Sequence, residues 1–172
     1  MNHPLTAASS DTRKRCFDPV VDANTRLLIL GSLPGEKSLA YSQYYAHPQN
    51  KFWLLMGEVL GPDLKSLPYA ARLDTLLAHG VGLWDVIAEA QRNGSLDSNI
   101  RDQAHNDLVG LLAGLPQLTT IAFNGGTAAR AGLKVLQEQA NRYRIVKLPS
   151  SSAAHTLPFS EKLAAWSALK EG

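Results

Sequence analysis

The chain has 172 residues, of which 45% are hydrophobic and 19% charged, and its formal net charge at pH 7 is +2. This length suits one domain with a sizeable core, which buries roughly 70% of the surface that the unfolded chain exposes. The composition is that of an ordinary globular protein, and so small a net charge does not by itself indicate a nucleic-acid partner.

The single cysteine, Cys16, and five scattered histidines limit what the chain can do with metals and disulfides. One thiol cannot close an internal disulfide, and no two histidines have the spacing of a metal-binding pair on one helix. We therefore expect no metal and no cofactor. No apolar run of about 18 residues predicts a membrane span. No such run follows the basic Arg13–Arg15 either, so we expect a cytoplasmic protein without a secretory signal.

Short apolar runs that stop at turn or loop signals predict buried strands. They lie at 26–31, 81–87, 118–123 and 143–148. Segments with helical spacing separate these runs and close the chain, with Ser160 as a candidate N-cap. They lie at 52–60, 69–79, 106–113, 127–140 and 160–169. A short helical stretch is also expected between residue 87 and the turn at Gly94-Ser95.

Strands that alternate with helices predict an α/β fold, with a parallel sheet covered on both faces. Residues 1–25 are polar and lack periodicity, so we expect a partly flexible extension before a single domain at 26–172. Ligands bind at the carboxyl ends of parallel strands. That rule selects the loops 31–51, 84–101, 124–127 and 148–157 as candidate binding regions.

The first of these loops, 31–38, reads GSLPGEKS and has some features of a phosphate-binding loop. That motif needs a glycine directly before the lysine, so that backbone N–H groups can wrap the phosphates. Glu36 stands there instead and puts a negative charge beside the ligand. A nucleotide-binding α/β protein is therefore only the weakest alternative.

The same loop continues into YYAHPQNKFW at 44–53, and a second motif, LPSSSAAHT, lies at 148–156. Together the two motifs resemble the uracil-DNA glycosylase superfamily, and within it the hypoxanthine-DNA glycosylase branch. They follow the first and fourth predicted strands in the family's order, and the resemblance covers residues 26–170. It implies a three-layer α/β/α sandwich with a central four-stranded, mainly parallel sheet. It also implies an enzyme that acts on damaged DNA, which we expect to be a monomer.

The first motif departs from the mismatch-specific uracil relatives at Leu33, where those proteins carry an asparagine that orients the attacking water. The aspartate of the uracil-specific branch is also missing from this loop. The resemblance to the hypoxanthine branch implies that Asn50 takes the catalytic role. An amide can place water at the sugar or donate to the departing base. The alternative is that Asn50 caps the helix starting at Lys51-Phe52, and both roles can coexist.

Residues that contact the everted base are expected in the same loops. Tyr45 matches an aromatic of the relatives and would stack on the base, although a surface tyrosine is the alternative. Ser32 and Leu33 of the first motif are also expected to contact the base. Asp85 and Asn124, which end the second and third strands, are further candidates. A helix cap at Asp85 and a plain glycine turn after Asn124 are the ordinary alternatives.

Contacts to the DNA backbone are expected from the second motif, although a serine-rich turn is the alternative. Pro149, Ser150, Ser151 and Ser152 offer hydroxyl and N–H groups that suit phosphate oxygens. His155 is a candidate for the wedge that fills the duplex after base flipping, or for a phosphate contact. Lys51, together with Lys37 and Lys147, flanks the loops and would make salt-dependent phosphate contacts.

These features predict a monofunctional DNA glycosylase that removes hypoxanthine (deoxyinosine) and leaves an abasic site. A Schiff-base lyase needs a lysine nucleophile in the pocket, and no lysine occupies an evident position of that kind. A mismatch-specific uracil-DNA glycosylase is the nearest alternative. A catalytically silent nucleic-acid-binding module of the same fold is the alternative from another class.

Overall fold

The structure, a computed structural model, describes residues 13–91 and 101–171 and is built on a central sheet of four parallel strands. The strands are β2 (Leu27–Gly31), β3 (Val81–Asp85), β6 (Thr120–Asn124) and β7 (Arg144–Leu148). Their order across the sheet is β3-β2-β6-β7, with every neighbouring pair parallel. The four predicted strands and the α/β class are confirmed.

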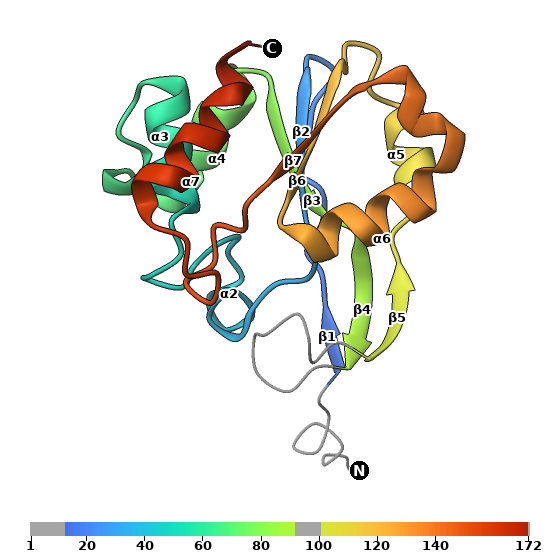
Figure 1. Ribbon diagram of the computed structural model, residues 1–172, viewed down its shortest axis with the longest axis horizontal. Coiled ribbons are helices and arrows are strands. Elements are labelled where there is room, and N and C mark those ends of the chain that lie inside the picture. The colour runs from blue at the N-terminus through green and yellow to red at the C-terminus, as the bar shows by residue number, and fades with distance from the viewer. Residues whose placement is uncertain (1–12, 92–100, 172) are drawn as a thin grey trace.

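Helices cover both faces of this sheet (Figure 1). One face carries α3 (Phe52–Leu60), α4 (Tyr69–Ala78) and α7 (Phe159–Trp166). The other face carries α5 (Leu108–Ala113) and α6 (Gly126–Leu136). Short 3-10 helices add η1 (Leu64–Ser66), η3 (Gln137–Arg142) and η4 (Ser167–Glu171). The three-layer sandwich is thus confirmed.

The sequence of β2, an inner strand of the sheet, is apolar without alternation because both of its faces are buried. Leu28 and Leu30 pack into the core on the side of α5 and α6, whereas Ile29 packs on the side of α3 and α7. All three are completely buried. Successive strand residues point to opposite faces, so a strand covered on both faces needs an unbroken apolar run.

Helix boundaries differ from the expected ones at two caps. Helix α7 begins at Phe159 directly after Pro158, so Ser160 lies inside the helix and is not its N-cap. Helix α5 begins at Leu108, and the Asp107 side chain caps it by accepting a hydrogen bond of 2.9 Å from the Gly110 N–H.

The helical stretch predicted after residue 87 is wrong, because the chain there forms strand β4 (Ile87–Gln91). β4 lies between β1 (Arg13–Arg15) and β5 (Arg101–His105) in a second, antiparallel sheet. Its alanine and glutamate residues favour a helix locally, but pairing with two strands distant in sequence decides its conformation. The expected Gly94-Ser95 turn lies outside the described residues.

The segment expected as a polar extension is anchored to both sheets where the structure describes it. β1 pairs with β4, and Val20 forms an antiparallel bridge with Leu83 of β3. Phe17 and Val20 also pack against the core on the α3 side. Residues 1–12 of that segment lie outside the described residues.

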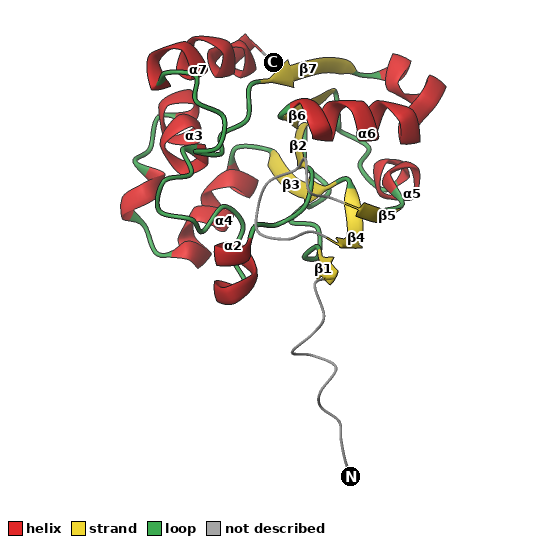
Figure 2. Ribbon diagram, turned by 60° about the horizontal axis from the view of Figure 1, so that its bottom comes forward, coloured by secondary structure: helices red, strands yellow, loops and turns green. Residues whose placement is uncertain are grey.

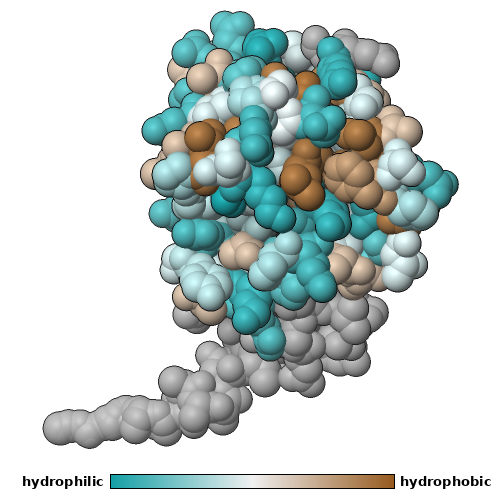
Figure 3. Space-filling view, turned by 90° about the vertical axis from the view of Figure 1, so that its left-hand side faces the viewer, coloured by the Kyte–Doolittle hydropathy of each residue, from teal (hydrophilic) through white to brown (hydrophobic). Residues whose placement is uncertain are grey.

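The carboxyl ends of the parallel strands and the short helix α2 (Glu36–Tyr41) lie on one edge of the molecule, which Figure 2 brings forward. On the outer face of α3, α4 and α7, hydrophilic side chains surround separate apolar ones (Figure 3). Among the described residues, only Tyr41 and Val109 are large hydrophobic side chains with extensive exposure. No helix in the described part of the chain has the length and apolar character needed to cross a membrane.

Candidate active site

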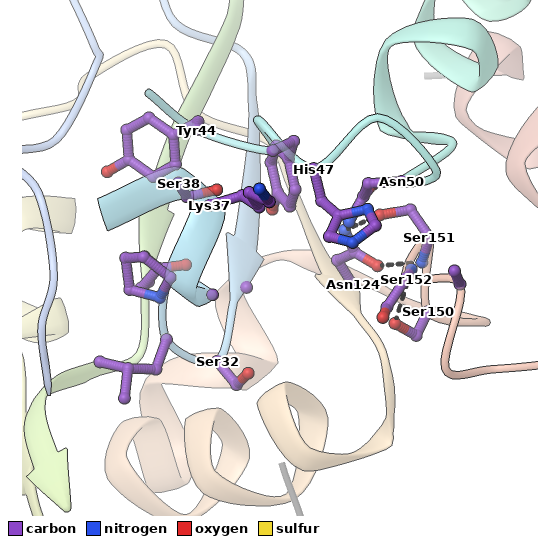
Figure 4. A pocket seen from close by; sticks show the side chains of 17 residues that line it. Ser32, Lys37, Ser38, Tyr44, His47, Asn50, Asn124, Ser150, Ser151 and Ser152 are labelled. Carbon is purple, nitrogen blue, oxygen red and sulfur yellow. Dashed lines mark hydrogen bonds between the residues drawn. The ribbon is translucent and has the colours of Figure 1, made fainter. Parts of the chain in front are cut away.

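A cavity of about 120 Å³ opens at the carboxyl edge of the parallel sheet, and each of the four predicted loops contributes to its wall. Figure 4 looks into it and shows the side chains converging from segments far apart in sequence. The predicted residues that line it are Ser32, Leu33, Tyr45, Asn50, Asp85, Asn124, Ser150, Ser151 and Ser152. The strand-end rule therefore located the cavity correctly.

Other predicted residues lie beside this cavity rather than in its wall. Pro149 precedes the lining serines, and Lys51 is the N-cap residue of α3 and donates its backbone N–H to the Ser151 carbonyl. His155 is exposed and lines a neighbouring hollow of about 210 Å³ at the start of α6. Of the other lysines, Lys37 lines the cavity, whereas Lys147 is an exposed residue of β7.

Sequence reasoning missed Ser38, Tyr44 and His47 as cavity residues. The Ser38 hydroxyl accepts a hydrogen bond of 3.0 Å from the Ala46 N–H, and it thereby closes the loop between α2 and α3. The His47 ring nitrogen Nδ1 accepts one of 3.1 Å from the Gln49 N–H. The only signal for these three residues was their position inside the first motif.

Asn50 is half-buried at the end of the first loop, immediately before α3. Its Oδ1 accepts a hydrogen bond of 2.9 Å from the Phe52 N–H, which satisfies one of the free donors at the start of the helix. Although the N-cap position of α3 is Lys51, the Asn50 side chain thus supplies a capping hydrogen bond to the first helical residue, and Asn50 also lines the cavity. Because the bond assigns the amide oxygen to the helix, the Nδ2 donors remain for a ligand.

Tyr45 forms an aromatic wall of the cavity and is not a surface tyrosine. Its ring stacks on that of Phe52, with centroids 4.0 Å apart and planes 16° from parallel. Phe52 is itself completely buried. The backbone of Tyr45 is in the left-handed region at φ 55°, a conformation that costs about 1 kcal/mol or more for a non-glycine residue. The loop thus holds this ring firmly in place.

Asp85 lies in the floor of the cavity and is 3% exposed. Gly31 is its parallel partner, and a Cβ at residue 31 would come 2.6 Å from Oδ1 of Asp85 and 3.0 Å from the Tyr45 hydroxyl oxygen. Glycine is therefore required at residue 31 for these two groups to approach the end of β2. Since β4 follows Asp85, the helix-cap alternative for this residue is wrong.

The negative charge of Asp85 influences neighbouring titratable groups. Burial raises the pKa of the Tyr44 hydroxyl far above its usual value, and the charge of Asp85 raises it further. Burial likewise raises the pKa of the Cys16 thiol, with a smaller contribution from Asp85. An ionised carboxylate only accepts hydrogen bonds, so Asp85 presents an acceptor to whatever enters the cavity.

Asn124 connects the end of β6 to the serine loop, which we define as Pro149–Ser152. The Ser151 N–H donates to Oδ1 of Asn124, and Nδ2 of Asn124 donates to Oγ of Ser151, both at 2.9 Å. Gly125 follows with φ 101°, and its N–H donates to the Leu148 carbonyl. The amide of Asn124 therefore clamps two strand ends together at the cavity wall.

Local hydrogen bonds hold the serine loop, and a turn at 153–154 follows it. The Ser150 hydroxyl accepts a hydrogen bond of 3.1 Å from the Ser152 N–H, and the Ser152 hydroxyl accepts one of 3.2 Å from the Ala154 N–H. Ser150 and Ser152 line both the cavity and the neighbouring hollow. The loop thus forms the ridge between these two depressions.

Comparisons with known proteins show which family the chain resembles. The Uracil DNA glycosylase superfamily matches residues 19–170. A protein named hypoxanthine DNA glycosylase from Methanosarcina acetivorans is 40% identical over 156 residues, which cover 91% of this chain and 97% of that protein. One of the same name from Methanosarcina barkeri is 39% identical over 154 residues, covering 90% and 96%.

One solved structure has a similar fold. The solution NMR structure of a candidate uracil DNA glycosylase from Methanosarcina acetivorans superposes with a TM-score of 0.82. It is 40% identical in sequence, and the match covers 92% of this chain and 96% of that one. Both expected motifs thus lie within an extended match that reaches across the whole sandwich. The chain belongs to the uracil DNA glycosylase superfamily.

Proposed function

We propose that this glycosylase excises hypoxanthine from deoxyinosine in DNA by hydrolysis and leaves an abasic site. The observation that carries the proposal is that Tyr45, Asn50 and Asp85 converge on one cavity. The first loop, which supplies Tyr45 and Asn50, has Leu33 in place of a polar residue. The relatives named hypoxanthine DNA glycosylase support this substrate.

Asn50 is the proposed catalytic residue. The transition state has oxocarbenium-like character at the sugar and negative charge on the departing base. The Nδ2 donors of Asn50 can hold the attacking water or stabilise that charge, while the bond from the Phe52 N–H to Oδ1 keeps the amide in one orientation. Removing such a preorganised donor costs on the order of 3 kcal/mol in the transition state.

Tyr45 and Asp85 are the proposed base-binding residues, together with Ser32, Leu33 and Asn124. Tyr45, held from behind by Phe52, supplies a flat face for stacking, which is worth about 1–3 kcal/mol per base. Hypoxanthine carries an N–H beside its carbonyl, whereas adenine has a lone pair at that ring nitrogen. The acceptor Asp85 therefore favours hypoxanthine over the adenine from which it arises.

DNA is the proposed partner, and the serine loop would hold its backbone on the ridge beside the cavity. The hydroxyls of Ser150 and Ser152 and the exposed His155 lie around this ridge. Lys51 contacts it through the hydrogen bond from its backbone N–H to the Ser151 carbonyl. Their contacts would position the duplex without reading its sequence. We further propose that the protein acts as a monomer in the cytoplasm.

The test compares two duplexes that differ only in one deoxyinosine or one deoxyuridine. Release of hypoxanthine from the first is expected to be faster, and preferential release of uracil would make this a mismatch-specific uracil enzyme instead. Salt-dependent binding without release of either base would indicate a silent DNA-binding module. A product strand that is cut without added alkali or lyase would contradict the monofunctional mechanism.

Asn50 needs a matched control because its side chain also caps α3. Asn50→Ala is expected to lower the single-turnover rate by about 100-fold or more. Asn50→Ser keeps an oxygen that can cap the helix but removes the amide donors. It should recover thermal stability without recovering activity, whereas recovery of both would assign Asn50 a purely structural role.

A further inference from the structure

Lys162 of α7 is a buried charged residue that the proposed chemistry does not use. Its side chain is 2% exposed, and its Nζ donates a hydrogen bond of 3.0 Å to the Ser152 carbonyl. Within residues 13–91 and 101–171, no carboxylate forms an ion pair with it. A buried ammonium group without a counter-charge is unfavourable, so its retention beneath the serine loop requires an explanation.

A second lysine increases this unbalanced positive charge. The Lys51 backbone N–H donates 2.9 Å to the Ser151 carbonyl, so α3 begins directly behind the loop. Burial lowers the pKa of Lys162, and repulsion from the Lys51 ammonium lowers it further. Lys162 and Lys51 therefore both contact the backbone of the serine loop, Lys162 through its ammonium group and Lys51 through its backbone N–H.

Three backbone carbonyls of the serine loop accept hydrogen bonds from other groups of the protein. The Pro149 carbonyl accepts a hydrogen bond of 2.9 Å from Trp166 Nε1. The Ser151 carbonyl accepts one from the Lys51 N–H. The Ser152 carbonyl accepts one from Lys162 Nζ and another of 3.0 Å from the His155 N–H. A phosphate group binds donors and is repelled by carbonyl oxygens. With these three carbonyls bonded to protein donors, the hydroxyls of Ser150 and Ser152 remain on the side of the cavity and the hollow.

We propose that Lys162 is a positioning residue for DNA: it holds the Ser152 carbonyl away from the bound strand and, with Lys51, gives the serine loop a positive potential. The backbone phosphate that the loop binds supplies the missing counter-charge. This inference rests on the proposed function, because it assumes that DNA is the ligand. Interactions between partly buried charges are screened less by solvent, so the potential acts on a phosphate that Lys162 does not touch.

Two substitutions separate the charge of Lys162 from its hydrogen bond. Lys162→Met removes both, whereas Lys162→Gln keeps an N–H donor for the Ser152 carbonyl without the charge. Lys162→Arg keeps both. Lys170→Met is the control, because Lys170 is exposed and lines a hollow with Arg26 and His79 at the opposite edge of the sheet.

The readout is the dissociation constant of a deoxyinosine duplex, measured by fluorescence anisotropy between 50 and 200 mM salt (on the order of the range over which phosphate contacts weaken). Lys162→Met is expected to weaken binding about tenfold at low salt and to reduce the slope of log K against log[salt] by about one. In steady-state kinetics, Lys162→Met should mainly raise KM and change kcat little. Lys162→Gln should show the reduced slope with a smaller loss of affinity.

An unchanged salt slope in both Lys162→Met and Lys162→Gln would overturn the inference, as would an equal loss in Lys170→Met. If Lys162→Met does not fold, Lys162→Gln carries the test. Failure here is distinct from failure of the proposed function. Wild-type protein that binds DNA but releases no base would refute the function alone, whereas active wild type with insensitive Lys162 variants would refute only this inference.

Discussion

Asn124 and Ser151 are joined by two hydrogen bonds of 2.9 Å across 27 residues of sequence. Both side chains are buried, at 7% and 1% exposure. This pair holds the serine loop against the end of β6, so that residues following β6 and β7 share one cavity wall. The geometry of the proposed DNA-binding ridge therefore depends on a contact inside the protein.

Asn124→Leu should destabilise the protein, because it leaves the buried Ser151 N–H and hydroxyl without partners. The expected loss is about 2–4 kcal/mol in the free energy of unfolding, measured by urea denaturation. Asn124→Asp keeps the acceptor for the Ser151 N–H and should lose less. Equal stability of Asn124→Leu and wild type would contradict the clamp.

Gly31→Ala should abolish most base excision. The new methyl group would come 2.6 Å from Oδ1 of Asp85 and 3.0 Å from the Tyr45 hydroxyl oxygen, so both side chains must shift. Misplacement on this scale typically costs about 100-fold in rate. Gly114→Ala is the matched control, because its nearest contact, the Leu111 carbonyl oxygen at 3.5 Å, is ordinary. Single-turnover release of hypoxanthine provides the measurement, and an active Gly31→Ala enzyme would refute this account of the cavity floor.

Asp85→Leu and Asp85→Asn should differ in activity on deoxyinosine. Asparagine keeps an oxygen that can accept the base N–H, whereas leucine has no acceptor. We expect kcat/KM to fall about tenfold in Asp85→Asn and by about 100-fold or more in Asp85→Leu, the scale on which an unpaired polar group is rejected. Equal activity of the two variants would show that this carboxylate does not contact the base.

Stability should fall in alkaline solution. Burial raises the pKa values of Cys16, Tyr44 and Tyr69, so the unfolded chain releases these protons at a lower pH than the folded protein does. Where the unfolded state binds fewer protons, stability decreases as pH rises. The decrease begins near the ordinary pKa values, 9.0 for the thiol and 10.0 for the two phenols.

Lys162 acts in the opposite direction, because its lowered pKa means that the unfolded chain keeps this proton to a higher pH. Because Cys16, Tyr44 and Tyr69 lower the stability as the pH rises and only Lys162 raises it, we expect a net loss of stability. Thermal melting between pH 8 and 11 measures it (roughly the range around the ordinary thiol and phenol pKa values). Tyr44→Phe should flatten the dependence, since Tyr44 is the most strongly shifted of these phenols. A melting temperature that does not change over this range would contradict the burial of these groups.

Much of the sandwich was predictable from local patterns. The unbroken apolar run at Leu27–Gly31 indicates a strand buried on both faces, and Leu28 and Ile29 do pack on opposite sides of the sheet. The cavity was predictable for a related reason: parallel strands end at the same edge, so residues that follow them gather there. Asn50, Asp85 and Ser151 are brought together in this way.

Only the tertiary structure decided what these residues contact. The strand at Ile87–Gln91 depends on partners at Arg13–Arg15 and Arg101–His105, which local propensity does not register. Asn124 lines the cavity as expected, but the sequence does not show that its amide also forms two hydrogen bonds with Ser151. The sequence places Lys162 in a helix but does not show that its side chain is buried. A long charged side chain can point to water or inward from the same helix position, and the surrounding packing determines which of these occurs.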